Sequence, residues 1–465
     1  NIPAAVHLQS NLSDGRYSIE ELARLAQENS VKVLILSDTL LRRWEYGLWP
    51  WRNLIKKNFE ESSVIKFGVN NYLSLVEQAQ KDNPGVLIIP AVEAGPFYYW
   101  KGSPFSKSGL SVYNWHKKML VVGLNKPEDY RFLPVVANYV YLPRNWKDVS
   151  GFCWPALLIA LGFLVNRFKL KKSFSFGGRH FSGEMAPFAS LKYIIIAVGL
   201  FFLINNLTFS VSPYDSYHGE KGIKPYQHLI DYANKKGALV FWLHPESSYT
   251  IEIMGVKIIT YSYKDDLLRA KDYAGFSGLY YDHITINQAG DLWDQILQEY
   301  CQDKRKSPVW VWGEVGYDGL SDKEINGIQT VLLLPSISRE NVMAALREGK
   351  MYAKQNRKKN DLSLVRFIIT DEEVSKVGFM GDDIRIRGKP RIEIRLTNGT
   401  FPGEEIDLRL IREGKIVQEM KAAGPELSWN FTDENCPKGR KTFYRLELES
   451  GFCKVLSNPI FVTSE

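Results

Sequence analysis

The sequence predicts an α/β protein: a seven-stranded parallel barrel, interrupted by a transmembrane helical hairpin and followed by a C-terminal antiparallel β-sandwich. Three observations lead to this prediction. Short continuous apolar runs alternate with helical patterns up to about residue 358, as in parallel strands covered on both faces. Two long uncharged stretches interrupt this series. Beyond residue 359 the runs become partly alternating, with turn residues between them, as in a β-sandwich.

Composition sets the limits of this prediction. The chain has 465 residues, room for roughly two to four domains. Apolar residues at 45% and charged residues at 24% are typical of a folded chain, and four cysteines exclude a disulfide-dense scaffold. The first residue is Asn, from which we expect a processed or trimmed amino terminus. The expected parts are the first part of the barrel (1–148), the hairpin with its basic loop (149–214), the second part of the barrel (215–358) and an Ig-like sandwich (359–465).

Seven apolar runs are the strand candidates of the barrel. All are free of charged residues, and they are Ala5–Ser10, Val33–Ser37, Val86–Val92, Met119–Leu124, Ala238–His244, Gly278–Tyr281 and Val309–Gly313. Helical patterns lie between them, and Ser18 and Glu21 have the spacing of a capping box ahead of one such helix. Strands joined by helical crossovers close into a barrel whose chemistry lies at the carboxyl ends of the strands.

The two uncharged stretches predict the hairpin. They are Val149–Val165, of 17 residues, and Tyr193–Tyr214, of 22 residues, and a membrane-crossing helix needs about 20 apolar residues. The segment 166–192 between them has six basic residues and one acidic residue, Glu184. Because short basic loops beside apolar spans stay in the cytoplasm, the barrel and the sandwich are expected on the extracytoplasmic side. The alternative is a pair of buried helices in a soluble protein.

Further features bear on the expected partners. Trp and Tyr residues among basic ones in Arg42–Lys57 suit a lipid headgroup layer, or equally an aromatic loop packed on the barrel. Small residues at Ala156, Ala160 and Gly162 allow close packing against a membrane-protein partner. The basic segment lacks a recognition helix or interleaved stacking residues, so no nucleic-acid partner is expected. The expected partners are therefore membrane lipid, a membrane protein and a phosphoester or envelope-polymer ligand.

The region after residue 359 predicts the sandwich. Its strand candidates are Val365–Thr370, Ile384–Arg387, Arg391–Thr397, Ile406–Arg412, Lys415–Gln418, Thr442–Glu449 and Asn458–Val462. Turn pairs such as Asn398-Gly399 separate them. Cys436 and Cys453 both belong to this region, and whether they pair depends on an oxidising compartment and on geometry that sequence does not supply.

Polar residues at the strand ends predict the site. They lie at the ends of successive strand candidates or shortly after them, and comprise His7, Asp14, Asp38, Glu93, His244 and Asp318. Each alone is more simply a cap or an ion-pair partner, whereas together they converge at one mouth of a barrel. Imidazole and carboxylate groups suit a divalent metal such as zinc, manganese or iron.

These residues and their neighbours resemble the motifs of the PHP (polymerase and histidinol phosphatase) superfamily. The start, VHLQSNLSDG, is similar to the family's His-x-His followed by Asp-Gly, and SDT at Ser37–Thr39 to its second motif. Glu93 in IIPAVEAG, His244 in WLHPE and the run WGEVGYDGL resemble the later motifs, in the family's order. The resemblance implies a seven-stranded barrel that binds two or three metal ions and hydrolyses phosphate esters.

The resemblance also implies which residues hold the metal. The positions that match are His7, Asp14, Glu93, His244 and Asp318. His7, Glu93 and Asp318 would surround one ion, and Asp14 and His244 would act catalytically by placing a second ion or the attacking water. Gln9, Thr39 and Leu320 stand where the family has histidines, and a further histidine is missing around Lys118–Leu120, although His116 is nearby.

Two functions remain open at this point. The first is a membrane-anchored, metal-dependent phosphoesterase with a reduced metal site, because the carboxylates needed to bridge metals are present. The second is a catalytically inactive relative that has lost its metal and serves as a binding or scaffold subunit at the membrane surface, because four imidazoles are absent.

Overall fold

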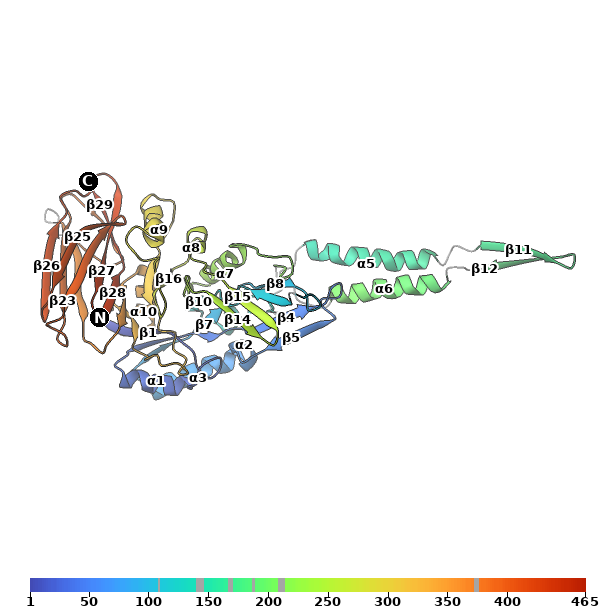
Figure 1. The fold of residues 1–465 in the computed structure, drawn as a ribbon, viewed down its shortest axis with the longest axis horizontal. Coiled ribbons are helices and arrows are strands. Elements are labelled where there is room, and N and C mark those ends of the chain that lie inside the picture. The colour runs from blue at the N-terminus through green and yellow to red at the C-terminus, as the bar shows by residue number, and fades with distance from the viewer. Residues whose placement is uncertain (108, 139–145, 166–169, 186–188, 208–213, 372–375) are drawn as a thin grey trace. The chain divides into compact units, whose positions relative to one another are not determined.

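The computed structural model describes residues 1–107, 109–138, 146–165, 170–185, 189–207, 214–371 and 376–465 (Figure 1). The chain divides into two compact units. Unit 1 comprises Asn1–Arg42, Glu61–Val136 and Tyr214–Glu465, and unit 2 comprises Arg43–Glu60 and Ala137–Pro213. Unit 1 contains the predicted site residues, so its sheets determine where they lie.

Most strands of unit 1 belong to two mixed sheets. The six-stranded sheet has the order β17 (Trp310–Gly313), β16 (Gly275–Leu279), β13 (Leu239–Trp242), β10 (Met119–Val122), β7 (Ala91–Ala94) and β3 (Asp38–Thr39). The larger sheet begins with β6 (Leu87–Ile89), β2 (Val33–Leu36), β1 (Ile2–Leu8), β18 (Ile328–Leu332) and β19 (Met351–Asn356). It continues into the C-terminal region with β28 (Cys453–Ser457), β27 (Lys441–Glu449), β29 (Ile460–Ser464) and β22 (Asp383–Ile386), and β24 (Ile406–Arg412) and β25 (Lys415–Ala422) branch from β27.

The predicted single parallel barrel is therefore wrong. Strand β10 runs antiparallel to both β7 and β13, and β1 runs antiparallel to β18. Each predicted apolar run does coincide with at least one strand. A continuous apolar run indicates that both faces of a strand are buried. It does not indicate whether the strand runs parallel or antiparallel to its neighbours. The fold is α/β with additional antiparallel sheets.

Helices cover the sheets of unit 1. They are α1 (Ile19–Glu28), α2 (Val64–Phe67), α3 (Val69–Asp82), α4 (Pro127–Arg131), α7 (Lys224–Lys235), α8 (Asp266–Arg269), α9 (Leu292–Cys301) and α10 (Arg339–Glu348). The predicted capping box of α1 is confirmed, because Ser18 Oγ accepts from Glu21 N and Glu21 Oε2 accepts from Ser18 N at 2.7 Å. A further sheet contains β8 (Tyr99–Gly102), β9 (Leu110–Tyr113), β14 (Tyr249–Ile253) and β15 (Val256–Thr260).

The main core lies between these sheets and helices and contains large aromatic side chains. Trp242, Trp293 and Trp312 are fully buried in it. The rings of Phe241 on β13 and Trp312 on β17 stack with centroids 3.9 Å apart. Burial of large aromatic side chains removes extensive apolar area from water. The core therefore fixes the positions of the strands that carry the site residues at their ends.

The C-terminal strands surround a second core. A four-stranded sheet of β21 (Lys376–Phe379), β20 (Ser363–Asp371), β23 (Arg391–Thr397) and β26 (Glu426–Thr432) contributes one side. Val331 and Tyr352 of β18 and β19 belong to this second core, so the two cores share strands. Arg445 is fully buried and binds both carboxylate oxygens of Asp294 on α9, at 2.6 and 2.7 Å. Cys436 and Cys453 are free thiols.

Unit 2 contains the predicted hairpin. Its helices α5 (Trp146–Val165) and α6 (Ala189–Leu207) lie antiparallel, side by side, and are joined through the ribbon of β11 (Leu170–Phe176) and β12 (Arg179–Met185) (Figure 1). The pair β4 (Arg43–Gly47) and β5 (Lys56–Glu60) completes the unit. The helices pack closely at glycines, since a Cβ on Gly162 would lie 2.5 Å from Ile196 Cγ1.

The predicted transmembrane hairpin is wrong, and so is the membrane location derived from it. In the parts of the chain that the structure describes, no helix has both the length and the apolar character needed to cross a membrane. Polar residues shorten the apolar part of each helix: α5 begins with Trp146-Lys147-Asp148, and Asn205 and Asn206 lie in the last turn of α6.

Buried core helices do not describe α5 and α6 either. Leu157 on α5 is 69% exposed and Ile194 on α6 is 58% exposed. Residues 208–213 of the second predicted span lie outside the described residues, as do 166–169 and 186–188 of the connecting segment.

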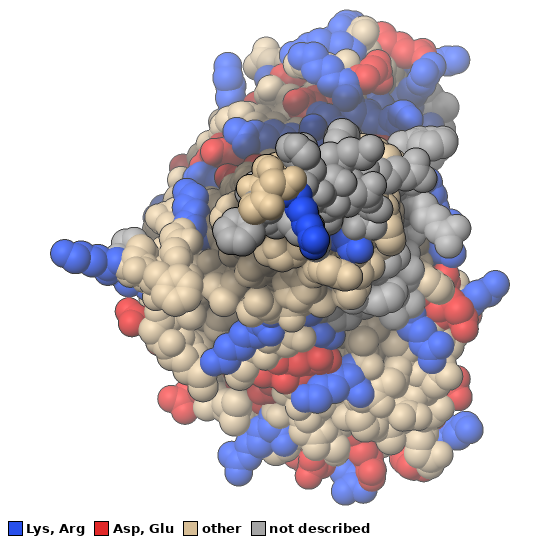
Figure 2. Space-filling model, turned by 90° about the vertical axis from the view of Figure 1, so that its right-hand side faces the viewer, with Lys and Arg blue, Asp and Glu red and all other residues tan. Residues whose placement is uncertain are grey.

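Charge on the face shown in Figure 2 is mixed. On the face shown in Figure 2, Lys and Arg side chains are interspersed with Asp and Glu side chains. A modest net charge of +7 at pH 7 agrees with this mixture and by itself points to no class of ligand.

Candidate metal centre

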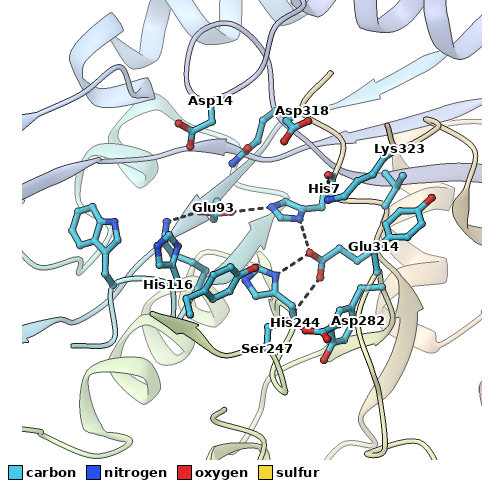
Figure 3. A pocket seen from close by; sticks show the side chains of 18 of the residues that line it. His7, Asp14, Glu93, His116, His244, Ser247, Asp282, Glu314, Asp318 and Lys323 are labelled. Atoms are coloured by element: carbon cyan, nitrogen blue, oxygen red, sulfur yellow. Dashed lines mark hydrogen bonds and ion pairs between the residues drawn. The ribbon is translucent and has the colours of Figure 1, made fainter. Parts of the chain in front are cut away.

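One cavity of unit 1 brings the predicted site residues together. It has a volume of about 360 Å³, and its lining includes all five predicted ligands: His7, Asp14, Glu93, His244 and Asp318. The ends of β1, β7, β13 and β17 meet there (Figure 3). The five residues nevertheless do not form one cluster, because their polar atoms have different partners.

His7 reaches the cavity through a β-bulge. The pairing of β1 with β2 shifts register between Val6 and Leu8, so His7 is the extra residue of the bulge. Its φ of +69° is rare for a residue with a side chain. A bulge turns a side chain out of its regular direction, and here it directs the imidazole into the cavity.

His244 also has an unusual backbone. It lies two residues after the end of β13 and has a φ of +28°. Its backbone N–H donates to Glu314 Oε2 at 3.2 Å, and its Nδ1 lies 3.0 Å from Glu314 Oε1. Left-handed conformations at non-glycine residues cost on the order of 1–3 kcal/mol and gather at functional sites. Both histidines of the cavity therefore carry backbone strain that the surrounding fold maintains.

Glu314 is placed by the end of β17. A Cβ at the preceding Gly313 would lie 2.4 Å from Gln329 O, so only glycine allows β17 to approach β18 this closely. Thr330 Oγ1 accepts from Gly313 N and donates to Gly313 O, which fixes the strand end. The hydroxyl of Ser277 on β16 donates to Glu314 Oε2. The carboxylate is therefore buried and fixed in position.

His7, His244 and Glu314 form a group with the chemistry of a metal site. One ligand atom from each lies within 4.8 Å of those of the other two. The Nδ1 atoms of His7 and His244 both face Oε1 of Glu314, at 2.6 and 3.0 Å (Figure 3). Two imidazoles and one carboxylate with room for water are the ligand set of many catalytic zinc centres. The donor set therefore fits a divalent transition metal.

Glu93 contacts this group without belonging to it. Its Oε2 lies 2.9 Å from His7 Nε2, and its Oε1 lies 2.5 Å from Lys118 Nζ. A carboxylate–histidine–metal arrangement fixes the orientation and tautomer of the ligand histidine. Glu93 is thus placed to orient His7, with its negative charge compensated by Lys118.

The charges of the cavity shift the pKa values of its members. Burial by itself lowers the pKa of His7, but the charges and hydrogen bonds of Glu314 and Glu93 outweigh it and raise the pKa to about 9. Burial tends to raise the pKa values of Glu93 and Glu314, but the charges and hydrogen bonds of Lys118 and His7 at Glu93, and of His7 and His244 at Glu314, hold both pKa values well below their ordinary range. In the metal-free protein His7 is an imidazolium between two carboxylates.

Asp14 and Asp318 line the same cavity with other partners. Asp14 forms an ion pair with Arg42, which also binds Glu61. Asp318 Oδ1 accepts from the backbone N–H groups of Leu320 and Ser321, at 2.9 and 3.1 Å. Burial opposes these hydrogen bonds, yet they lower the pKa of Asp318. Their predicted roles as ligands remain expectations.

The other positions singled out by the sequence lie as follows. Asp38 is fully buried and accepts through Oδ1 from Ser10 N at 2.8 Å and from the hydroxyl groups of Ser10 and Ser13. Gln9 lines the cavity, and Leu320 is 70% exposed. His116 also lines it, and burial together with the charge of Lys118 lowers its pKa to about 4. His116 is therefore neutral at pH 7.

Sequence reasoning missed Glu314 and Lys118. Glu314 directly follows the last predicted strand, as Glu93 follows an earlier one, and stands in the run WGEVGYDGL. That position was a usable signal, but the resemblance directed attention to Asp318 four residues later. The signal for Lys118 was only indirect: the resemblance marks Lys118–Leu120 as the place of a missing histidine, but a lone lysine before a strand is most often a surface residue.

Comparisons with known proteins give the following. No model of a protein family matches the sequence, and no curated protein matches it. The chain is similar to a two-domain protein from Bacteroides vulgatus ATCC 8482 that contains a predicted PHP-like metal-dependent phosphoesterase, with 10% identity, 96% of this chain and 90% of the other covered, and a TM-score of 0.35.

Two further structures are similar to part of the chain. One is a putative metal-dependent phosphoesterase from Bifidobacterium adolescentis ATCC 15703, with 9% identity, 69% of this chain and 91% of that chain covered, and a TM-score of 0.28. The other is an amidohydrolase from Chromobacterium violaceum with bound sulfate and no metal, with 9% identity, 69% and 89% covered, and a TM-score of 0.29.

Proposed function

We propose that the chain is a PHP-type phosphoesterase that uses a divalent metal ion held by His7, His244 and Glu314. The observation that carries the proposal is the convergence of two histidines, both on strained backbone, on one buried carboxylate. Strain of this kind persists only where the surrounding structure maintains it, and structural ion pairs do not require it. The order of the motifs along the sequence supports a phosphate ester as the substrate.

The residues of the cavity have distinct tasks in this proposal. His7, His244 and Glu314 hold the ion, and Glu93 orients His7 through Nε2. A divalent ion bound there supplies an activated water and neutralises charge on a phosphoryl oxygen. The cavity also presents cationic groups, among them Lys118 and Lys323, to an anionic ligand.

An inactive binding module is the second candidate function, and one observation favours it. Every member of the His7, Glu93, Glu314 and Lys118 network already has an internal partner of opposite charge. A network that is complete without an ion resembles a structural ion-pair cluster. In that case the cavity would bind a ligand without turning it over.

Metal binding and hydrolysis separate these functions. Metal-stripped protein is titrated with Mn²⁺, Zn²⁺ and Fe²⁺, and hydrolysis of a generic phosphomonoester and a generic phosphodiester is followed with each ion. We expect bound metal and metal-dependent hydrolysis, both lost in Glu314→Gln. Glu77→Gln, an exposed position on α3, is the matched control and is expected to keep both.

The alternatives give different results. Bound metal without hydrolysis of either substrate would favour the binding module. Absence of metal binding with all three ions would contradict the proposed function. Loss of metal in Glu77→Gln as well as in Glu314→Gln would show that the assay reports general destabilisation.

A further inference from the structure

We propose that Lys118 takes the place of a second metal ion, so that the site works with one metal and one fixed ammonium group that binds a phosphoryl oxygen of the substrate. The inference rests on the proposed function and names the second cation of that site. It starts from Glu93, the carboxylate from which a two-metal site would need a free oxygen.

Both oxygens of Glu93 are occupied by cations of the chain itself. Oε1 is bound by Lys118 Nζ at 2.5 Å and Oε2 by His7 Nε2 at 2.9 Å. The side chains of Lys118 and Glu93 are only 12% and 7% exposed. Moving the lysine aside would leave a charge without its partner in a partly buried place, which is unfavourable. A second metal ion therefore has no free carboxylate oxygen at Glu93.

The backbone keeps Lys118 beside Glu93. Lys118 immediately precedes β10, and the next residues of β10 pair with β7, Met119 opposite Ala94 and Leu120 opposite Glu93. On the other edge of β10, Leu243 N donates to Lys118 O at 3.3 Å. The lysine therefore stands at the end of a central strand and not on a free loop.

The ammonium group is also directed at the ligand space. Lys118 lines the same cavity as His7, His244 and Glu314. An ammonium has three N–H donors, and Glu93 accepts one of them, so two remain for a ligand. Its neighbour His116 is neutral and has no hydrogen-bond partner at Nε2. The positive charge is therefore available to a tetrahedral oxyanion such as a phosphoryl group.

The first test is stoichiometry and phosphate affinity. Wild-type protein is titrated with Mn²⁺ and, at saturating Mn²⁺, with inorganic phosphate. We expect one Mn²⁺ per chain. Lys118→Met should keep that one Mn²⁺ and weaken phosphate binding about tenfold to a hundredfold, because a hydrogen bond from a charged donor is lost. Lys118→Arg should restore most of the affinity, and the exposed Lys81→Met is the matched control.

The double variant Lys118→Met with Glu93→Gln is the second test. It removes both charges of the pair, so neither is left buried without a partner and the variant is expected to fold. It should hold one Mn²⁺ at saturation and still bind phosphate weakly. Two Mn²⁺ per wild-type chain, or phosphate affinity unchanged in both variants without Lys118, would overturn the inference while leaving the proposed function standing. Absence of bound Mn²⁺ in the wild type would instead contradict the proposed function.

Discussion

His7 donates through Nε2 to Oε2 of Glu93 at 2.9 Å, and this contact determines which way the second ring nitrogen points. A carboxylate can only accept, so Nε2 carries a proton and Nδ1 is directed at Glu314. The His7 ring thus lies between two carboxylates. Glu93 orients the ring through Nε2, and Glu314 lies with Nδ1 in the proposed metal group. Changes at Glu93 should therefore act through His7.

Glu93→Gln tests this relationship. The amide still accepts a hydrogen bond from His7, but it removes the negative charge that strengthens the ligand. Loss of such a partner typically lowers metal affinity by about 10–100-fold. We expect Mn²⁺ affinity to fall within that range, measured by titration calorimetry, while Glu314→Gln abolishes binding. Complete loss of metal in Glu93→Gln would instead make Glu93 a direct ligand.

Metal-free protein should lose stability as the pH rises from about 6.5 to about 9. The pKa of His7 is 6.5 when unperturbed and about 9 in the fold, so its protonated form stabilises the folded state fully below 6.5. That contribution disappears as the pH rises through 9. The loss amounts to up to about 3 kcal/mol, at 1.36 kcal/mol for each pH unit of the difference.

Thermal unfolding in the presence of a chelator at several pH values measures this effect. His7→Gln has no titrating group and is the control, so its unfolding temperature should change less between pH 6.5 and 9. An equal slope in the wild type and in His7→Gln would contradict the assignment of the effect to His7.

Asp318→Asn should leave metal binding intact. Asp318 Oδ1 accepts two backbone hydrogen bonds and one from the Ser321 hydroxyl at 3.0 Å, so this oxygen stabilises its own turn. The amide can keep most of these contacts. We expect Mn²⁺ affinity within about twofold of the wild type by calorimetry. Loss of the ion would restore the ligand role that the sequence motif predicts for Asp318.

Arg445→Met should destabilise the fold strongly. Arg445 and Asp294 are fully buried partners, and removing one charge leaves the other unpaired, which costs about 3–5 kcal/mol. Arg366→Ala, which breaks an exposed pair with Glu393, should change stability by less than about 1 kcal/mol. Chemical denaturation measures both, and equal effects would contradict the distinction. Adding Asp294→Leu to Arg445→Met should recover part of the loss.

Local signals predicted the positions of the strands and the start of α1. The predicted runs Val33–Ser37 and Val309–Gly313 coincide with β2 and β17. Strands that are buried on both faces consist of apolar residues, so such strands can be found from the sequence. Strand direction depends on partners far along the chain, which is why β10 was wrongly expected to be parallel. The apolar hairpin gave a strong local pattern, yet helix length and terminal polar residues decided against a membrane crossing.

The candidate site was predicted in part. His7 lies near the end of β1 and His244 lies two residues after β13; both were recognised by residue type, and both belong to the metal group. Glu314 was missed because its role depends on meeting residues that lie 307 and 70 positions earlier in the chain. The pairing of Glu93 with Lys118 similarly depends on the register between β7 and β10. The pattern of apolar residues in the sequence does not indicate which residues of β7 and β10 lie opposite each other.

The sheet shared by β19 and β28 limits how this protein could be rebuilt by recombination. Asn458, next to β28, binds Val311 N and O of β17 at 2.8 and 3.0 Å and Met351 O of β19 at 3.0 Å. A gene fusion that exchanged the C-terminal strands for another module would leave β19 with an open edge, ready to pair with other chains. It would also remove Asn458, which binds β17 at Val311, three residues before Glu314. The C-terminal strands and the part of the chain that carries the site are therefore expected to be inherited together.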